Sequence, residues 1–474
     1  MATISKTKNS TQSGFILPLV VVVVIIVALI GAGIVSLGYH SRILSHRNTQ
    51  HILAVQAAEA GITQALRDMN YTKIKYDGIP EDFLGKPELQ QNTDIYLPSA
   101  GGAKFNYIIE EITDTLDPSL RYKITSTGEA PPAKKVFVAT TKLYSILDFA
   151  IFVKKSIYLY PNSIVNAIDS SAGNEILPAQ IATNSTDESA VIAKPGSVVN
   201  GDVLVGAGGD PDYIVDDSGG KGSITGSLTT LSQVYYFPLV YPPPLPALLA
   251  GKTTKITGGS IDCTQNGVYN SIDLPKNGTL EFVKKPSVAD PYIIIVIKGD
   301  LNMGISSVIN ANPNANVLIK VRGNMNMDGK STLNAKALAS VVINVMGNIT
   351  MKSDSGITVV PGNGTKLAIY LYGNWVSQPN AYINNAGFAG NLQIYGYNPV
   401  WQQITLYSNN NFHGIIYAPT ADLNIYPRDS ITGSFMSNNF DLKSKGVVTY
   451  DYSSKNISSD ALKYFGISRW LREQ

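Results

Sequence analysis

The sequence predicts an α+β protein that is mainly β: a long N-terminal helix, a small β-sheet, a large parallel β-helix (β-solenoid) and a short C-terminal helix. No charged residue occurs between Asn9 and Tyr39, and the apolar part of this run, residues 15–37, is long enough to cross a bilayer, which takes roughly 20 residues. Glycine (41) and tyrosine (26, against 13 phenylalanines) are abundant, which favours β-structure with many turns. Glycines also recur at nearly even steps, at Gly299, Gly323, Gly347, Gly373 and Gly396.

Residues 1–14 are predicted to be a leader peptide. Lys6 and Lys8 come first, and the small residue Gly14 lies immediately before the apolar run. A secretory signal peptide would carry its cleavage site after the apolar run. The order here favours a helix that stays on the mature protein. An ordinary membrane anchor that keeps its leader is the alternative.

One helix is predicted over residues 15–70, because helical spacing continues past the apolar run to about Met69. Small residues recur on one side of the extension, and bulkier apolar residues run beside them. The small stripe is Ala54, Ala58, Gly61 and Ala65, and the bulkier stripe is Ile52, Val55, Ile62 and Leu66. A helix that packs in lipid at one end and on protein at the other suits a subunit transferred from a membrane to a filament.

Two features of the N-terminal part stand out: Gly14-Phe15 before the long helix, and the segment Gln56-Ala57-Ala58-Glu59-Ala60-Gly61. With these features the N-terminal part resembles those of PilX-type minor type IV pilins and of the related pseudopilins. It implies cleavage after Gly14 by a prepilin peptidase and methylation of the new amino terminus at Phe15. It also implies insertion in the bacterial inner membrane and assembly with other pilins or pseudopilins through the helix.

The first helical turn departs from the ordinary pilin pattern. Ordinary pilins carry a glutamate at the fifth mature position, where this chain has Leu19 after Pro18. Proline is tolerated so close to a helix start because its missing N–H would be unpaired anyway. In this family the missing glutamate implies a place at the filament tip. We expect Leu19, Pro18 and the small stripe of Ala54, Ala58, Gly61 and Ala65 to take part in assembly.

Residues 71–148 are predicted to form a small β-rich domain of the pilin type. Alternating segments occur at 105–109, 122–126 and 136–140, separated by turn-rich stretches. The segment from Tyr122 to Gly128 is similar to the strand that follows the long helix in PilX-like subunits. Nothing in this domain resembles a catalytic site.

Residues 149–455 are predicted to form the β-solenoid. Each of the first four recurring glycines follows an apolar or mixed run and precedes a polar one. Repeats of about 20–50 residues indicate solenoids or propellers, and propeller blades need about 40 or more, so the shorter glycine spacing here favours the solenoid. Residues 149–240 are expected to begin the same structure, and the prolines near 242–246 form a stiff connector.

Several short phrases resemble large PilX-type proteins that carry a polymer-forming-like β-helix. They include Val199-Asn200-Gly201-Asp202-Val203 and Gly414-Ile415-Ile416-Tyr417-Ala418-Pro419. The last predicted element is a C-terminal helical segment at residues 456–474. Cys263 is the only cysteine, so no disulfide forms within one chain, and we expect a buried, inert thiol.

No enzymatic activity and no cofactor are predicted. The only dense acidic group is Asp210, Asp212, Asp216 and Asp217. It lies in a glycine-rich stretch, which indicates a solvated loop. A calcium site is the weaker alternative, because the spacing of the aspartates does not match an EF-hand. His413 is the only histidine of the predicted solenoid, which excludes a multi-histidine metal site there. No Gly-x-Ser-x-Gly elbow occurs. With 15% charged residues and a net charge of +2, nothing indicates nucleic-acid binding.

The predicted function is that of a minor pilin or pseudopilin at or near the tip of a type IV pilus or secretion-like filament. A rigid body as large as residues 149–455 on every helix would obstruct the stacking of shaft subunits. After membrane insertion the chain would reach the pilus or cell surface, where the solenoid starts assembly or contacts a surface or glycan. A self-associating surface scaffold and an anchored protein that binds or acts on polysaccharide are the alternatives.

Overall fold

The chain folds into two compact units in this computed structural model. Unit 1 comprises Met1–Tyr144 and Phe465–Gln474, and unit 2 comprises Ser145–Tyr464, so unit 2 is inserted in the sequence of unit 1. The predicted processing site at Gly14 and Phe15, and also Cys263, lie outside the described residues. The structure describes residues 16–75, 89, 94–97, 102–112, 120–170, 175–217, 223–231, 234–235, 237, 239–244, 255–262, 267–283, 293–361, 364–384, 388–408, 412–426, 430–443, 445–452, 454 and 463–472.

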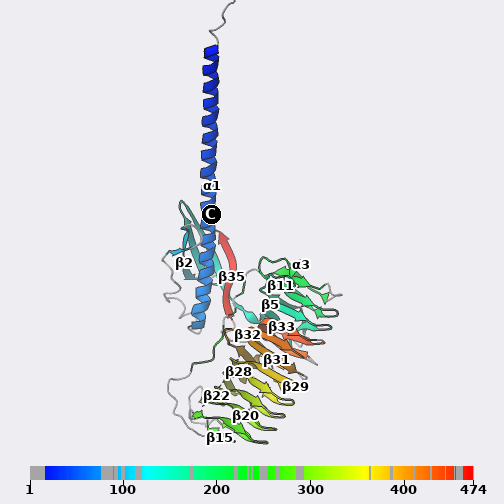
Figure 1. Cartoon of the computed structure of the whole chain (residues 1–474). Coiled ribbons are helices and arrows are strands. Elements are labelled where there is room, and N and C mark those ends of the chain that lie inside the picture. The colour runs from blue at the N-terminus through cyan, green and yellow to red at the C-terminus, as the bar shows by residue number, and fades with distance from the viewer. Residues whose placement is uncertain are drawn as a thin grey trace, which may run out of the picture. The chain divides into compact units, whose positions relative to one another are not determined.

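Unit 1 begins with a single helix of 60 residues, α1 (Ile16–Lys75) (Figure 1). Pro18 lies in its first turn, where a missing N–H costs no helical hydrogen bond. It holds one stretch that is long and apolar enough to span a membrane, with a mean hydropathy of 3.2 over 18 residues. None of that window is buried by the rest of the chain.

The C-terminal half of α1 packs on a five-stranded sheet. Its strands are β1 (Ile95–Tyr96), β2 (Lys104–Glu111), β3 (Leu120–Ala130), β4 (Ala133–Ser145) and β35 (Lys463–Arg472), paired in this order. The pairs from β1 to β4 are antiparallel, as short connections between successive strands allow. Phe105, Tyr107 and Ile124 alternate with exposed or half-buried neighbours, and they bury their side chains under the helix.

The predicted C-terminal helix is wrong, because residues 463–472 form strand β35. Aromatic and β-branched residues here favour a strand, and β4 offers a free edge for pairing. Phe465 is buried and packs edge-on against Tyr122, with ring centroids 5.4 Å apart. The Asn70 side chain then ties the helix to the strand: its amide donates to the Phe465 carbonyl (3.1 Å), and its oxygen accepts from the Phe465 N–H (2.8 Å).

Unit 2 is built from short strands that join into a 30-stranded sheet, in which nearly all pairs are parallel. Three short helical segments accompany them: η2 (Ile146–Asp148), α3 (Pro211–Ile214) and η4 (Ala389–Asn391). The first strands are β5 (Ile151–Leu159), β6 (Ile164–Asp169), β7 (Glu175–Leu177), β8 (Ala179–Thr183), β9 (Val191–Ala193), β10 (Val198–Val199), β11 (Gly201–Val205), β12 (Val215–Asp216), β13 (Ser223–Ile224) and β14 (Leu228–Thr230).

The remaining strands carry the predicted glycine repeat. They are β15 (Gly259–Asp262), β16 (Gly267–Tyr269), β17 (Ile272–Leu274), β18 (Thr279–Val283), β19 (Ile293–Ile297), β20 (Leu301–Met303), β21 (Val308–Ala311), β22 (Asn316–Val321), β23 (Met325–Met327), β24 (Thr332–Ala335), β25 (Ser340–Val345), β26 (Ile349–Met351), β27 (Gly356–Val359), β28 (Lys366–Leu371), β29 (Trp375–Ile383), β30 (Leu392–Gly396), β31 (Gln402–Ser408), β32 (Phe412–Ile425), β33 (Ser430–Leu442) and β34 (Val447–Asp451).

Each strand of the regular part pairs in parallel with the strand three positions further along. Val317 of β22 lies opposite Val341 of β25, and Val341 lies opposite Leu367 of β28. These steps match those from Gly323 to Gly347 and from Gly347 to Gly373. The spacing of the glycines is thus the length of chain between paired strands. Three strands make one repeat, and successive repeats stack (Figure 1).

The stack is not in sequence order. The first strand, β5, lies in its middle, paired with β33 on one side and with β8 and β9 on the other. From β5 the chain builds outward to β14, crosses to the other end at β15, and builds back to β33 and β34. Entry and exit therefore lie in adjacent strands, a closeness of ends that suits a domain inserted in another.

The connector across the stack carries aromatic side chains onto its wall. The backbone of Tyr235 exchanges two hydrogen bonds with the Asn184 side chain, of 2.6 and 3.0 Å. Phe237 then packs on Phe152 of β5, with ring centroids 4.7 Å apart. Tyr241, in the described part of the Pro-rich segment, lies 6.1 Å from the Tyr397 ring. Successive connector residues thus meet successive repeats, in the order in which the repeats stack.

The Gly-Asn pairs occupy a corner of each repeat. A Cβ atom added to Gly347 would lie 2.5 Å from the Gly323 carbonyl oxygen, so only glycine lets the two repeats approach this closely. The asparagine after each glycine links one corner to the next by a hydrogen bond. The Asn324 side-chain oxygen accepts the Asn348 N–H (2.9 Å), and the Asn348 side-chain oxygen accepts the Asn374 N–H (2.8 Å).

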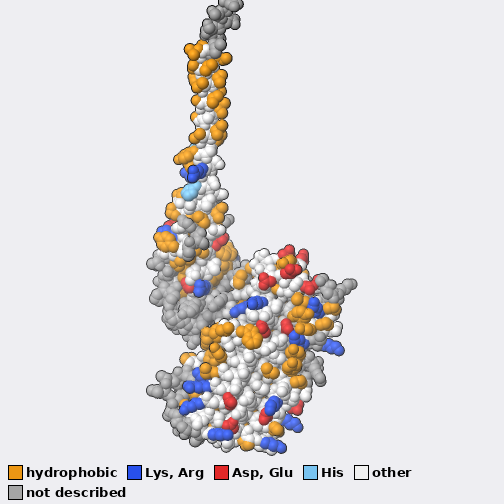
Figure 2. Space-filling view, viewed as in Figure 1, with side chains coloured by type: hydrophobic (Ala, Val, Ile, Leu, Met, Phe, Trp, Pro, Cys, Tyr) orange, Lys and Arg blue, Asp and Glu red, His pale blue; other side chains and the backbone are white. Residues whose placement is uncertain are grey.

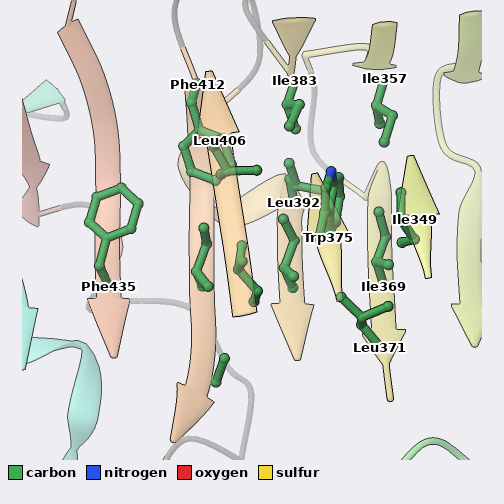
Figure 3. Close-up of a cluster of buried hydrophobic side chains, with 14 of the residues drawn as sticks. Ile349, Ile357, Ile369, Leu371, Trp375, Ile383, Leu392, Leu406, Phe412 and Phe435 are labelled. Atoms are coloured by element: carbon green, nitrogen blue, oxygen red, sulfur yellow. The ribbon is translucent and has the colours of Figure 1, made fainter. Parts of the chain in front are cut away.

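The core of unit 2 consists of apolar side chains that point between the strands of each repeat. Ile349, Ile369 and Trp375 are at most 1% exposed, and Figure 3 shows them gathered with residues of neighbouring repeats. Their burial follows from strand alternation, since inward residues of one strand stack on inward residues of the next.

Candidate functional site

The N-terminal half of α1 is an apolar surface that the described chain leaves uncovered. Its large apolar side chains from Leu17 to Leu37 are 50–75% exposed, including every position from Leu19 to Val27, so they surround the helix. Figure 2 shows those on the visible face. A helix that is apolar all round is stable only in lipid or packed among other apolar helices. This half of α1 therefore has to be covered by something outside the described chain.

The first turn of this surface is neutral. No acidic residue occurs there, and Leu19 is 63% exposed beside Pro18. An exposed leucine is compatible with lipid, whereas an unpaired carboxylate at that depth would be expensive. Leu19 thus presents an apolar contact in the first turn of α1.

The small stripe of α1 packs inside unit 1. Ala54, Ala58 and Ala65 are fully buried, and Gly61 faces Ser126 and Phe105 of the sheet. These residues were expected to take part in assembly, and in the structure they lie under the chain's own sheet. Periodicity shows that a face is small but not what covers it. Ala57 and Met69 share the same interface, although the predicted stripe does not contain them.

Close approach is what the small residues provide. A Cβ on Gly128 of β3 would lie 2.2 Å from the Ala54 carbonyl oxygen and 2.3 Å from the Ala58 nitrogen. Helix and strand therefore touch backbone to backbone. Nearby, the Tyr107 hydroxyl donates to Asp68 of α1 at 2.5 Å, and burial followed by this hydrogen bond raises the pKa of Tyr107. This contact, like the Asn70 bonds to Phe465, supplements an apolar interface.

A basic hollow lies just beyond the apolar half of α1. Tyr39, Arg42, His46 and Arg47 surround about 380 Å³ beside Pro132 of the β3–β4 turn. Basic and aromatic side chains at this point are typical of the boundary between lipid and water. The position of this belt marks where the exposed helix stops being apolar.

The acidic group of unit 2 has a structural use. The Asp210 side chain accepts the Asp212 N–H (3.1 Å) and caps α3, while Asp216 lies in β12 and Asp217 is exposed after it. Within the described residues, no three His, Cys, Asp or Glu side chains come together as metal ligands. Helix capping accounts for Asp210, as expected for aspartate at this position.

Comparison with known proteins finds limited likeness. A family model described as a domain of unknown function (DUF7305) matches residues 338–457, about a quarter of the chain. No curated protein sequence matches. Among solved structures, the chain is similar to the competence-associated pilin ComZ from Thermus thermophilus, at 14% identity, with 90% of this chain and 97% of that chain covered and a TM-score of 0.22. At this TM-score the likeness carries no argument about the fold or function of this chain.

Proposed function

We propose that this protein is a minor pilin or pseudopilin of the PilX type, a structural subunit of a type IV pilus or secretion-like filament. One observation carries the proposal: a single helix, α1, is bare and apolar over its first half and covered by its own sheet over its second half. Such a helix crosses the inner membrane first. It then trades lipid for the helices of other pilins, since both surround it with apolar surface.

The N-terminal leader completes this route. A prepilin peptidase removes residues 1–14 after Gly14, and the new terminus at Phe15 is methylated. Leu19 supplies no carboxylate to pair with a neighbouring subunit's amino terminus, which favours a place where one neighbour is missing. That place is the tip, or a sparse position in the shaft.

Unit 2 is the displayed module, and we infer that its stacked repeats form a β-solenoid of the polymer-forming type. The parallel pairing of β22 with β25 and of β25 with β28, one glycine interval apart each time, supports this architecture. A body of this size on every helix would obstruct the next subunit, which supports a tip position again. At the pilus or cell surface the module either initiates assembly or contacts a surface. It does so without catalysis and without a cofactor.

A membrane-anchored surface protein that never enters a filament is the second candidate, because a bare apolar helix serves it equally well. Intact mass of the chain purified from membranes separates the two. The proposal expects a chain that starts at Phe15 and carries one added methyl group. A Gly14→Val variant serves as the control and should keep its leader. A wild-type chain that retains residues 1–14 contradicts the proposal.

A further inference from the structure

A polar hollow lies on the outer wall of unit 2, where the last strands of the stack meet the first. Strands β31, β32, β33 and β5 run side by side there, with Gln403 opposite Asp422, Asp422 opposite Asn439, and Asn439 opposite Ser156. The hollow has a volume of about 300 Å³. Its polar lining, called the junction face below, is Ser156, Gln403, Asp422, Asn424, Asn439 and Asp441.

Part of the junction face is held rigidly by hydrogen bonds. The Asp422 carboxylate accepts from Trp401 Nε1 (2.8 Å) and from Asn439 Nδ2 (2.6 Å). The Asn439 oxygen accepts from the Ser156 hydroxyl at 2.8 Å. Since Ser156 comes from the first strand and the others come from the last repeats, the hollow exists only where the first strand of unit 2 pairs with the last repeats.

Two other members of the junction face are left open. The side-chain amides of Gln403 and Asn424 make no hydrogen bond to any residue that the structure describes. Elsewhere on the same wall, outward amides pair with each other, as Asn326 does with Asn302 (2.8 Å). An unpaired amide offers both a donor and an acceptor at a fixed place. These two amides are therefore available to a ligand.

Aromatic side chains flank the hollow on both sides. Trp401 is 49% exposed at one rim. Three tyrosines lie on the other side: Tyr407 and Tyr426, whose stacked rings have centroids 4.2 Å apart, and Tyr160, whose ring has the Lys443 ammonium 4.1 Å above it. The floor is polar and Trp401 offers a flat apolar face at one rim. The tyrosines of the other side carry the Lys443 ammonium, which lies over the Tyr160 and Tyr426 rings.

This combination matches the chemistry of a sugar. A pyranose ring has hydroxyls around its rim, which pair with amides and carboxylates, and C–H faces, which stack on aromatic rings. The Asp422 carboxylate, whose hydrogen-bond donors Trp401 and Asn439 are neutral, disfavours a ligand that is itself acidic, since like charges repel in a partly desolvated site. Asp441 is paired with the Lys443 ammonium at 2.7 Å.

We propose that the junction face binds a neutral oligosaccharide and is the surface-contacting site of this protein. The inference deepens the proposed function, because an adhesive site has to be displayed outside the cell. The pairing of β33 with β5 assembles this site, so binding requires the first strand of unit 2 as well as its last repeats.

The test uses the full chain in detergent micelles. A panel of neutral oligosaccharides (glucans, mannans, galactans and N-acetylhexosamine oligomers) and of uronic-acid oligomers is first screened, and the best neutral binder is titrated by calorimetry. Asn424→Ala and Trp401→Ala should each weaken binding about tenfold, since each removes contacts worth about one hydrogen bond or one ring stacking. The matched control is Asn326→Ala, in the same outward row four strands away, which should leave affinity unchanged. Thermal midpoints show that each variant is folded.

The inference is overturned if no neutral oligosaccharide binds, if uronic-acid oligomers bind better, or if the affinity is the same in Asn424→Ala and Trp401→Ala as in the wild type. Release of new reducing ends would also overturn it, because the hollow would then be a hydrolase site. These outcomes are separable from failure of the proposed function. A chain that retains its leader but binds sugar would support sugar binding at the junction face and contradict the filament role. A processed chain that binds no sugar would support the filament role and contradict sugar binding.

Discussion

Replacing Gly347 by alanine should increase the distance between the repeat that contains Gly347 and the preceding repeat, which contains Gly323, and so destabilise unit 2. The added Cβ would lie 2.5 Å from the Gly323 carbonyl oxygen and 2.6 Å from the Asn324 side-chain oxygen, whereas ordinary contacts begin at 3.4 Å. The neighbouring backbone has to move by roughly 0.9 Å, against a strand spacing of about 4.8 Å. Overpacking of this kind costs about 1–3 kcal/mol, so the midpoint of thermal unfolding should fall by a few degrees.

The matched control is Gly329→Ala, whose nearest contact would be 3.2 Å from the Ser353 oxygen. Both variants gain the same methyl group and lose the same unfolded-state freedom, so only the corner differs. Calorimetry of the full chain in micelles gives the midpoints. Hydrogen exchange over residues 341–351 should rise in Gly347→Ala alone. Equal midpoints for the two variants would refute the reasoning that glycine is needed for close stacking.

Three further predictions concern the closure of the stack, its acid stability and the packing of unit 1. Asn439→Ala removes the hydrogen bonds to Ser156 and Asp422, so the local stability of β5 and β33 should fall by about 1–3 kcal/mol and their hydrogen exchange should become faster. The control Asn438→Ala loses one bond of 3.4 Å and should exchange like the wild type. Equal exchange rates in the two variants would count against a stabilising role of the Asn439 bonds between β33 and β5. Hydrogen bonds from Asn312 and Asn310 lower the pKa of Glu281 below its ordinary 4.5. The stability that the ionised Glu281 gives the fold is therefore complete above pH 4.5 and is lost as the pH falls further. Below pH 4.5 hydrogen exchange in β18 and β21 should rise, and a Glu281→Gln variant should show no such rise. Ala58→Leu should separate α1 from β3 and lower the stability of unit 1 by about 1–3 kcal/mol, which proteolysis detects as faster cleavage. The control Gln56→Leu, at an exposed position, should leave the cleavage rate unchanged. An unchanged rate for Ala58→Leu would contradict the backbone contact at Gly128.

The sequence predicted the local elements well because their signals are local. The uncharged run of α1 and the regular spacing of glycines each follow from one segment and its period. The place of β5 in the middle of the stack could not be predicted, since a strand of alternating residues pairs equally well with several others. Strand β35 was missed for the same reason: the whole of unit 2 separates it in sequence from its partner β4.

The sites show the same division. Leu19 is exposed in the first turn, where its sequence position put it. The small stripe of α1 was placed on the right helix, but burial under β3 depends on a tertiary contact through Gly128 that spacing does not reveal. The junction face could not be found, because Ser156 and Asn439 lie far apart in the sequence and meet only through the closure of the stack.

The central claim is that this chain enters a filament, and the most direct measurement is its presence in filaments sheared from intact cells. We expect the processed chain in the sheared fraction at a small fraction of the major subunit, and its loss from that fraction, with retention in membranes, for the Gly14→Val variant. A wild-type chain found only in the membrane fraction, while the major subunit is sheared normally, would contradict the account.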